Sequence, residues 1–188
     1  MSTVKATHFE HPSASTAGIT LAADGSVVLP QGFTGGVGSN VVQTVKTDTF
    51  TTTSGTFTPL TSFEVTITPS SATSKVLVTA QVAVGPESAQ IGYLRLRRGG
   101  TAISGAVGDT AGSRTSATIA PFGNSSNDIY SLVVSYLDSP ATTSPTTYDF
   151  DIRTISGSTV GINRAIIDTD TANIRRLIST LTVIEVAA

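Results

Sequence analysis

The chain has 188 residues, a formal net charge of −2 and charged side chains at only 13% of its positions. Lys and Arg never occur in runs longer than two, which argues against a nucleic-acid-binding surface. No stretch of about 18 apolar residues exists, so membrane insertion is not expected. Because the chain has no cysteine, it has neither disulfides nor a cysteine-based metal site.

Serine and threonine take the place of the missing charge, with 23 Ser and 32 Thr beside 17 Gly. Thr is β-branched and suits a pleated, half-buried surface, whereas Gly and Ser suit tight turns. The composition therefore predicts an all-β protein, and the length suggests one domain plus a tail. Residues 1–5 lack the apolar segment of a secretory signal, so we expect synthesis in a cytoplasm.

Residues 1–40 differ from the rest of the chain and are expected to form an N-terminal arm. Two short apolar segments, 19–21 and 27–29, flank Asp24-Gly25, a pair typical of a two-residue hairpin turn. An isolated hairpin is marginal in water, so the arm should pack against the domain, a sister chain or a larger assembly. Its predicted contact residues are Ile19, Leu21, Val27, Val28 and Leu29.

Residues 41–188 hold a succession of short segments with a period of two, as expected of strands with one buried face. Segment 76–84 is apolar on both faces, which favours a central position in a sheet. In segment 91–97, Leu94 and Leu96 are expected inside, and Gly99-Gly100 is expected to form a hairpin turn. Further strands are expected at 41–53, 63–67, 115–122, 159–163 and 177–186.

The longest predicted element is a β-hairpin over residues 129–154. Tyr130, Leu132, Val134 and Tyr136 alternate with more polar positions on its first strand. On the return strand Tyr148, Phe150 and Ile152 are expected inside, with Asp149, Asp151 and Arg153 on a wet face. The connecting segment 138–145 contains two prolines and is expected to be a loop.

About ten short strands joined by turns of Gly, Pro, Ser and Asn predict a two-sheet β-sandwich. A jelly-roll-like order is preferred, because the long terminal strands are expected to lie centrally. No window shows helical periodicity of useful length. The predicted organisation is an extended arm for attachment or oligomerisation, residues 1–40, followed by a β-sandwich domain, residues 41–188.

Blocks of sequence along nearly the whole chain resemble virion structural proteins of phages, especially cyanophages and marine phages. The blocks are GITLAADGSV at 18–27, VVQTVKTDTF at 41–50, ITPSSATSKVLV at 67–78, RRGGTAI at 97–103, SYLDSP at 135–140 and ISTLTVIEV at 178–186. The resemblance implies a non-enzymatic β-domain on a phage particle, commonly trimeric, in a tail-fibre or capsid-decoration component. It supplies no catalytic motif.

The resemblance also sets expectations for location and partners. We expect a virion protein, assembled in the host cytoplasm, whose partners are its sister chains in a homotrimer and other virion proteins that contact the arm. Host surface polysaccharide is a further expected partner, whereas nucleic acid and membrane insertion are not expected.

The two histidines of the chain, His8 and His11, both lie in the arm. On a threefold axis they could share a metal among three chains, because imidazole is a common metal ligand. Two histidines without a third ligand are more simply read as part of a solvated arm. Their position also argues against a Ser-His-Asp triad on the domain. We therefore predict no metal, cofactor or catalytic site.

Two pairs of aspartates could in principle carry chemistry. Asp149 and Asp151 have a spacing that a glycosidase carboxylate pair can adopt, although alternation already explains them as an exposed strand face. Asp168 and Asp170 could bind Ca²⁺, but no EF-hand spacing follows them, so a polar loop is the simpler interpretation.

Arginines supply the candidate interface residues of the domain. Arg95, Arg97 and Arg98 form the one local basic cluster, and could meet an acidic neighbour such as a sister chain's aspartates; a solvated strand face is the simpler interpretation. Asp109 and Arg114 share a loop, where they could pair with each other or fix register at a subunit interface.

Three classes of function follow from these observations. The first is a non-enzymatic structural protein, a short trimeric tail-fibre-type protein attached through its arm, or alternatively a capsid decoration or cement protein. The second is a carbohydrate-binding module, although the chain has no Trp and its Tyr residues are expected mostly in the core. The third is a polysaccharide-degrading enzyme, which lacks a recognisable site constellation.

Overall fold

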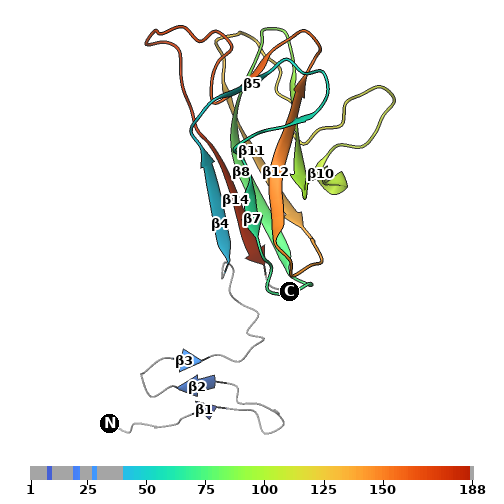
Figure 1. Ribbon diagram of the computed structural model, residues 1–188, viewed down its shortest axis with the longest axis vertical. Coiled ribbons are helices and arrows are strands. Elements are labelled where there is room, and N and C mark those ends of the chain that lie inside the picture. Colours follow the sequence, from blue (N-terminus) through green and yellow to red (C-terminus); the bar gives the residue numbers. More distant parts are fainter. Residues whose placement is uncertain (1–7, 10–18, 22–26, 29–39, 187–188) are drawn as a thin grey trace. The chain divides into compact units, whose positions relative to one another are not determined.

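The computed structural model describes residues 8–9, 19–21, 27–28 and 40–186 (Figure 1). The chain divides into two units, Met1–Gly36 and Val37–Ala188, and each is described by itself. The described residues are mainly strands, and their one helix is the short 3₁₀ helix η1 (Ser104–Ala106). Within these residues no helix is long and apolar enough to cross a membrane.

The first unit contains a three-stranded antiparallel sheet with the order β1-β2-β3. Its strands are β1 (His8–Phe9), β2 (Ile19–Leu21) and β3 (Val27–Val28). Leu21 pairs with Val27, as expected of the hairpin predicted for this region. The turn at Asp24-Gly25 and the predicted contact residue Leu29 lie outside the described residues. Strand β1 was not predicted.

The second unit is a β-sandwich of two antiparallel sheets, which confirms the predicted all-β, two-sheet fold (Figure 1). Its strands are β4 (Val41–Lys46), β5 (Phe50–Thr52), β6 (Thr58–Pro59), β7 (Val65–Ile67), β8 (Lys75–Pro86), β9 (Gly92–Arg98), β10 (Thr101–Ala102), β11 (Tyr130–Asp138), β12 (Thr146–Thr154), β13 (Val160–Ile162) and β14 (Ser179–Val186). Each sheet is named below by its central strand.

The β8 sheet is built around the longest strand of the protein. One edge of β8 pairs with β14 and then β13, while the other edge pairs with β11 over nine consecutive positions. Strand β4 lies beyond β14, so the first and last strands of the sandwich are neighbours. The β12 sheet has the order β10-β9-β12, with β6 and β7 on the far edge of β12.

The predicted hairpin over residues 129–154 is wrong, because its two strands lie in different sheets. Strand β11 pairs with β8, and β12 pairs with β9 on one edge and with β6 and β7 on the other. Hairpin loops usually have two to five residues, and the proline-containing loop between β11 and β12 is longer. The loop instead carries the chain across the sandwich, so the two apolar faces oppose each other.

The core lies between the two sheets and is formed as the alternation predicted. Tyr148, Phe150 and Ile152 of β12 are completely buried, and the rings of Phe63 and Phe150 stack with centroids 6.0 Å apart. Val76, Val78, Ala80, Val82 and Val84 supply the opposing surface of β8. The core thus consists mainly of β-branched side chains with few aromatic rings.

Two further strand predictions need correction. Segment 115–122 forms no strand; it makes only single bridges from Ile119 to Leu94 and from Phe122 to Ile91. Pro121, which has no backbone N–H, interrupts any longer ladder there. Segment 41–53 forms two separate strands, β4 and β5, which pair with different partners.

Glu185 ties together the beginning and the end of the sandwich. Its carboxylate accepts hydrogen bonds from the Ser70 backbone N–H at 2.7 Å, from Ser70 Oγ at 2.6 Å and from Asn40 Nδ2 at 3.4 Å. Burial raises the pKa of this carboxyl group, but the hydrogen bonds from Ser70 and Asn40 outweigh burial and leave the pKa below its ordinary value.

We expect Glu185→Gln to lower the free energy of unfolding at pH 7 by about 1–3 kcal/mol, because it removes charged hydrogen bonds from a buried position. A carboxyl whose folded-state pKa is lowered stabilises above its unfolded pKa of about 4.3, and this contribution is lost as pH falls through the folded pKa. The difference in the free energy of unfolding between wild type and variant, measured by urea unfolding, should therefore be smaller at pH 3 than at pH 7. An equal difference at both pH values would contradict this assignment.

Neighbouring valines on β11 provide a test of the inside–outside assignment. Val134 is 5% exposed and Val133 is 72% exposed. We expect Val134→Ala to lower the free energy of unfolding by about 1.5–3 kcal/mol, since it removes two buried methyl groups. The matched control Val133→Ala should change it by about 0.5 kcal/mol or less. Similar losses in urea unfolding for both variants would refute the assignment.

Candidate interaction surface

The outer face of the β12 sheet carries two cross-strand ion pairs. Strand register places Arg95 opposite Asp151 and Arg97 opposite Asp149. Arg95 Nε lies 3.0 Å from Asp151 Oδ1, and its Nη2 lies 2.5 Å from Oδ2. Arg97 Nε lies 2.9 Å from Asp149 Oδ1, and its Nη2 contacts Oδ2. Both pairs have the two-pronged geometry that makes arginine–carboxylate contacts strong.

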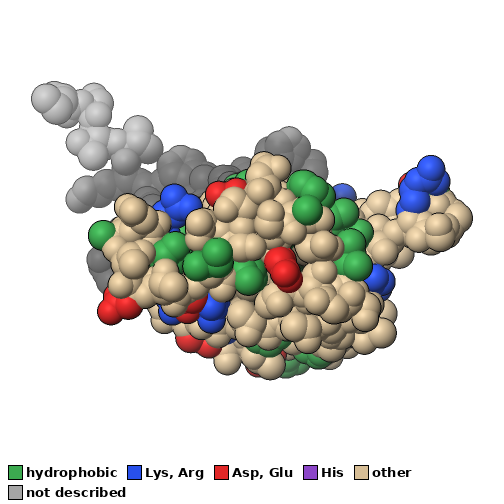
Figure 2. All heavy atoms as spheres, turned by 90° about the horizontal axis from the view of Figure 1, so that it is seen from above, with side chains coloured by type: hydrophobic (Ala, Val, Ile, Leu, Met, Phe, Trp, Pro, Cys, Tyr) green, Lys and Arg blue, Asp and Glu red, His purple; other side chains and the backbone are tan. Residues whose placement is uncertain are grey.

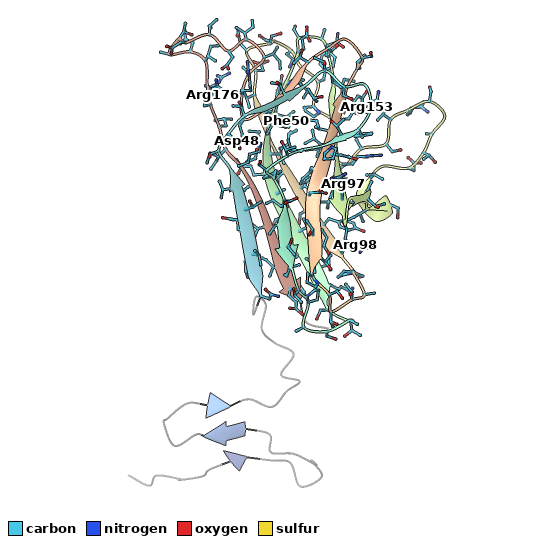
Figure 3. All side chains as sticks on the ribbon, in the orientation of Figure 1. Asp48, Phe50, Arg97, Arg98, Arg153 and Arg176 are labelled. Atoms are coloured by element: carbon cyan, nitrogen blue, oxygen red, sulfur yellow. The ribbon has the colours of Figure 1, made fainter. Side chains whose placement is uncertain are left out.

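These pairs correct the expectation that Asp149 and Asp151 lie on a wet face. Their residues are only 9% and 3% exposed, because the guanidinium groups of the neighbouring strand cover them. Asp149 raises the pKa of Arg97 through its hydrogen bond, against the opposing effect of burial. Arg95 and Arg97, proposed as interface residues, are thus bound to carboxylates of their own chain. Figure 3 shows Arg97, Arg98 and Arg153 on the β9–β12 side, away from Asp48 near β4.

A third arginine joins the two sheets. Arg98 Nη1 contacts the two carboxylate oxygens of Asp138 at 2.8 and 2.7 Å, and the Tyr148 hydroxyl donates to Oδ2 at 2.7 Å. Asp138 belongs to β11, whereas Arg98 and Tyr148 belong to the opposite sheet. Burial and the hydrogen bond to Asp138 raise the pKa of Tyr148 above its ordinary value. Sequence reasoning placed Asp138 in the loop, although its even-numbered position on β11 already indicates the inner face.

Aromatic rings lie beside Arg95 and Arg153 on this face. The guanidinium carbon of Arg95 lies 3.6 Å from the centroid of the Phe57 ring, and that of Arg153 lies 5.4 Å from the Tyr93 ring and 5.7 Å from the Phe57 ring. Such stacking is a cation–π arrangement. Tyr93 is therefore a half-buried residue of the outer face and does not belong to the core. Sugar binding by the chain stays a prediction.

The predicted pair of Asp109 and Arg114 does not form. Arg114 Nη1 instead donates to the carbonyl oxygen of Ala111 at 3.2 Å, and the carbonyl oxygen of Asp109 accepts from Ser116 Oγ at 2.9 Å. Gly112, with φ +61°, turns the chain between them. Figure 2 shows basic atoms at the tip of a projecting part of the surface, and Figure 1 shows the loop after β10 extending away from the sandwich.

The other candidate ligands have ordinary partners. Asp168 Oδ2 lies 2.5 Å from Arg176 Nη2 and 3.1 Å from Arg164 Nη2. Among the described residues no group of three or more His, Asp or Glu side chains is arranged to hold a metal ion. His8 lies in β1, and His11 lies outside the described residues.

The outer face of the β8 sheet differs in character from that of the β12 sheet. Directly paired residues share a face, so the registers of β4, β14, β8 and β11 define three rows across the four strands. The rows are Val41–Ile184–Leu77–Leu137, Gln43–Thr182–Thr79–Ser135 and Val45–Thr180–Gln81–Val133. We call these twelve residues the outer wall.

The outer wall contains no charged residue. Four of its side chains are among the most exposed large apolar side chains of the described chain: Val133 (72%), Val41 (53%), Val45 (46%) and Leu137 (46%). Apolar groups on an uncharged, regular sheet face favour burial against another protein surface. Sequence reasoning did not identify the residues of this wall, because that requires the strand order and register.

We expect Arg97→Ala to lower the free energy of unfolding by about 1–3 kcal/mol, because it leaves the largely buried Asp149 carboxylate without its partner. The change should leave self-association unaffected, since this pair lies within one chain. Urea unfolding and light scattering measure the two quantities separately. A loss of association without a loss of stability would instead support an interface role for Arg97. Arg114→Ala, at the tip of an exposed loop, is the matched control and should leave both unchanged.

No protein-family model matches the chain, and no curated protein sequence matches it.

Proposed function

We propose that this protein is a non-enzymatic structural protein of a phage particle, a short homotrimeric fibre-type protein that attaches through its N-terminal arm. The observation that carries the proposal is the uncharged outer wall on the β8 sheet. The sequence resemblance supports placement on a virion, and a capsid decoration protein would use the same surface in the same way.

The outer wall suits contact with copies of the same chain. One row consists of Val, Ile and Leu, the middle row of Gln, Thr and Ser, and the third row has a valine at each end, so apolar contact and hydrogen bonding are both available. No side chain of the wall carries a charge that would have to be buried without a partner, which would cost several kcal/mol. On the β12 sheet, Arg95 and Arg97 are already paired with Asp151 and Asp149 of the same chain, so these four residues offer less to a partner.

The size of the wall indicates that it is one part of a larger contact. Four strands spaced about 4.8 Å apart and five residues with a rise of about 3.3 Å give a face of roughly 20 by 17 Å. Two such faces together bury about 700 Å², which is less than a specific interface usually buries. A stable trimer therefore needs additional contacts, and the arm, a separate unit of the chain, is the natural source.

We expect the full chain to have three times its 19.2 kDa mass by light scattering after size exclusion. Val133→Glu should weaken this association at least about tenfold, because it places a charge in a contact that is otherwise uncharged. Ile155→Glu is the matched control, since Ile155 is 41% exposed and lies outside the wall. A monomeric full chain, or a Val133→Glu variant that associates like wild type, would refute self-association through the wall.

A further inference from the structure

Strand β11 leaves one edge of the β8 sheet open. Ala83 of β8 directs its backbone away from β11, because its N–H donates to Ser179 Oγ at 3.0 Å and its carbonyl oxygen accepts from Asn163 at 2.8 Å. Backbone direction alternates along a strand, so the even-numbered residues of β8 face β11. Their partners Leu132, Val134 and Tyr136 face back toward β8.

The remaining backbone groups of β11 therefore point outward. These are the N–H and C=O groups of Ser131, Val133, Ser135 and Leu137, and within residues 40–186 no backbone hydrogen bond satisfies them. Strands usually protect such an edge with a proline, a bulge or a charged side chain. Between Tyr130 and Leu137 this strand has no proline, no charge and an unbroken register with β8.

A groove runs along this open edge. It has a volume of about 480 Å³ and lies between residues 133–136 of β11 and two segments of the loop after β10, residues 105–108 and 117–119. Its lining is uncharged and contains small side chains. Tyr136, Ile119 and Ala106 at this site pack against the core but are only partly buried. The core is therefore incompletely covered where the backbone groups of β11 lack partners.

We propose that the groove accepts β3 of a second copy of this chain as an added strand beside β11. An unpaired strand edge is complemented by an extended backbone, and an incompletely covered core is complemented by alternating apolar side chains. The inference rests on the proposed self-association and identifies its second contact. It would extend the sheet to the order β1-β2-β3 of one copy followed by β11-β8-β14-β4 of the next.

The properties of β3 match this site. Among the described residues β3 pairs only with β2, so its second edge is available. Its sequence, Val27–Val28, is β-branched and uncharged, like the lining of the groove. The lack of charge in the groove thus favours an uncharged strand such as β3 over a charged peptide.

The decisive experiment is amide hydrogen exchange of the full chain at Val133 and Ser135. Both amides should exchange at least about tenfold more slowly in the trimer than in the chain limited to residues 41–188, whose sandwich contains the entire core described above. If the full chain is trimeric while these amides exchange at equal rates in both, strand addition is wrong and association through the wall stands. A monomeric full chain refutes both.

A pair of variants at Ser135 tests the same contact in a second way. Ser135→Pro removes an outward N–H from β11, and edge strands tolerate proline at such positions. Ser135→Ala is the matched control, because it changes the same side chain of the outer wall but keeps the backbone N–H. With both variants folded by circular dichroism, Ser135→Pro should weaken association about tenfold relative to Ser135→Ala. Equal association of Ser135→Pro and wild type would overturn the proposal.

Discussion

Buried carboxylates set the conditions that the rest of this sandwich must meet. A buried charge is expensive unless a partner of opposite charge or a set of hydrogen-bond donors accompanies it. Asp149 and Asp151 receive Arg97 and Arg95 from the adjacent strand, Asp138 receives Arg98 from the opposite sheet, and Glu185 receives the donors of Ser70 and Asn40. These contacts fix the register of β9 against β12 and the spacing between the sheets.

The same requirement explains why the two faces of the sandwich differ. A chain with only 13% charged residues has few ions to distribute, and three arginines of β9 are used within the fold. The outer wall of the β8 sheet is then left with Val, Ile, Leu, Thr, Ser and Gln, and Lys75 is a charged residue beside it on the same face. Assembly with copies of the same chain would remove this face from water. Strand addition at the open edge of β11 would join a second copy to the edge of the sheet.

The sequence predicted what depends on local periodicity and missed what depends on pairing. Alternation correctly placed Leu94, Leu96, Phe150 and Ile152 in the core, and Gly99-Gly100 adopts the positive φ values that its turn requires. Alternation alone also placed Asp149 and Asp151 in water, because the cover they receive comes from a strand distant in sequence. The prediction that β11 and β12 form a hairpin was wrong for the same reason, because the partner of a strand depends on the arrangement of all strands in the fold. The residues of the outer wall could not be identified from the sequence, because they depend on the register of four strands.

The adjacency of the first and last strands has a mechanical consequence. The sandwich begins at Asn40 and ends near Val186, and Glu185 joins the two through its backbone N–H and its carboxylate. Tension applied between these two ends pulls the β4–β14 ladder apart one hydrogen bond at a time, as a zipper opens. Tension applied between Asn40 and the segment that precedes β14, at the other end of the ladder, loads all bonds of that ladder together, parallel to the strands. A particle protein held by its arm and contacted at its far end would thus bear load in its stronger direction.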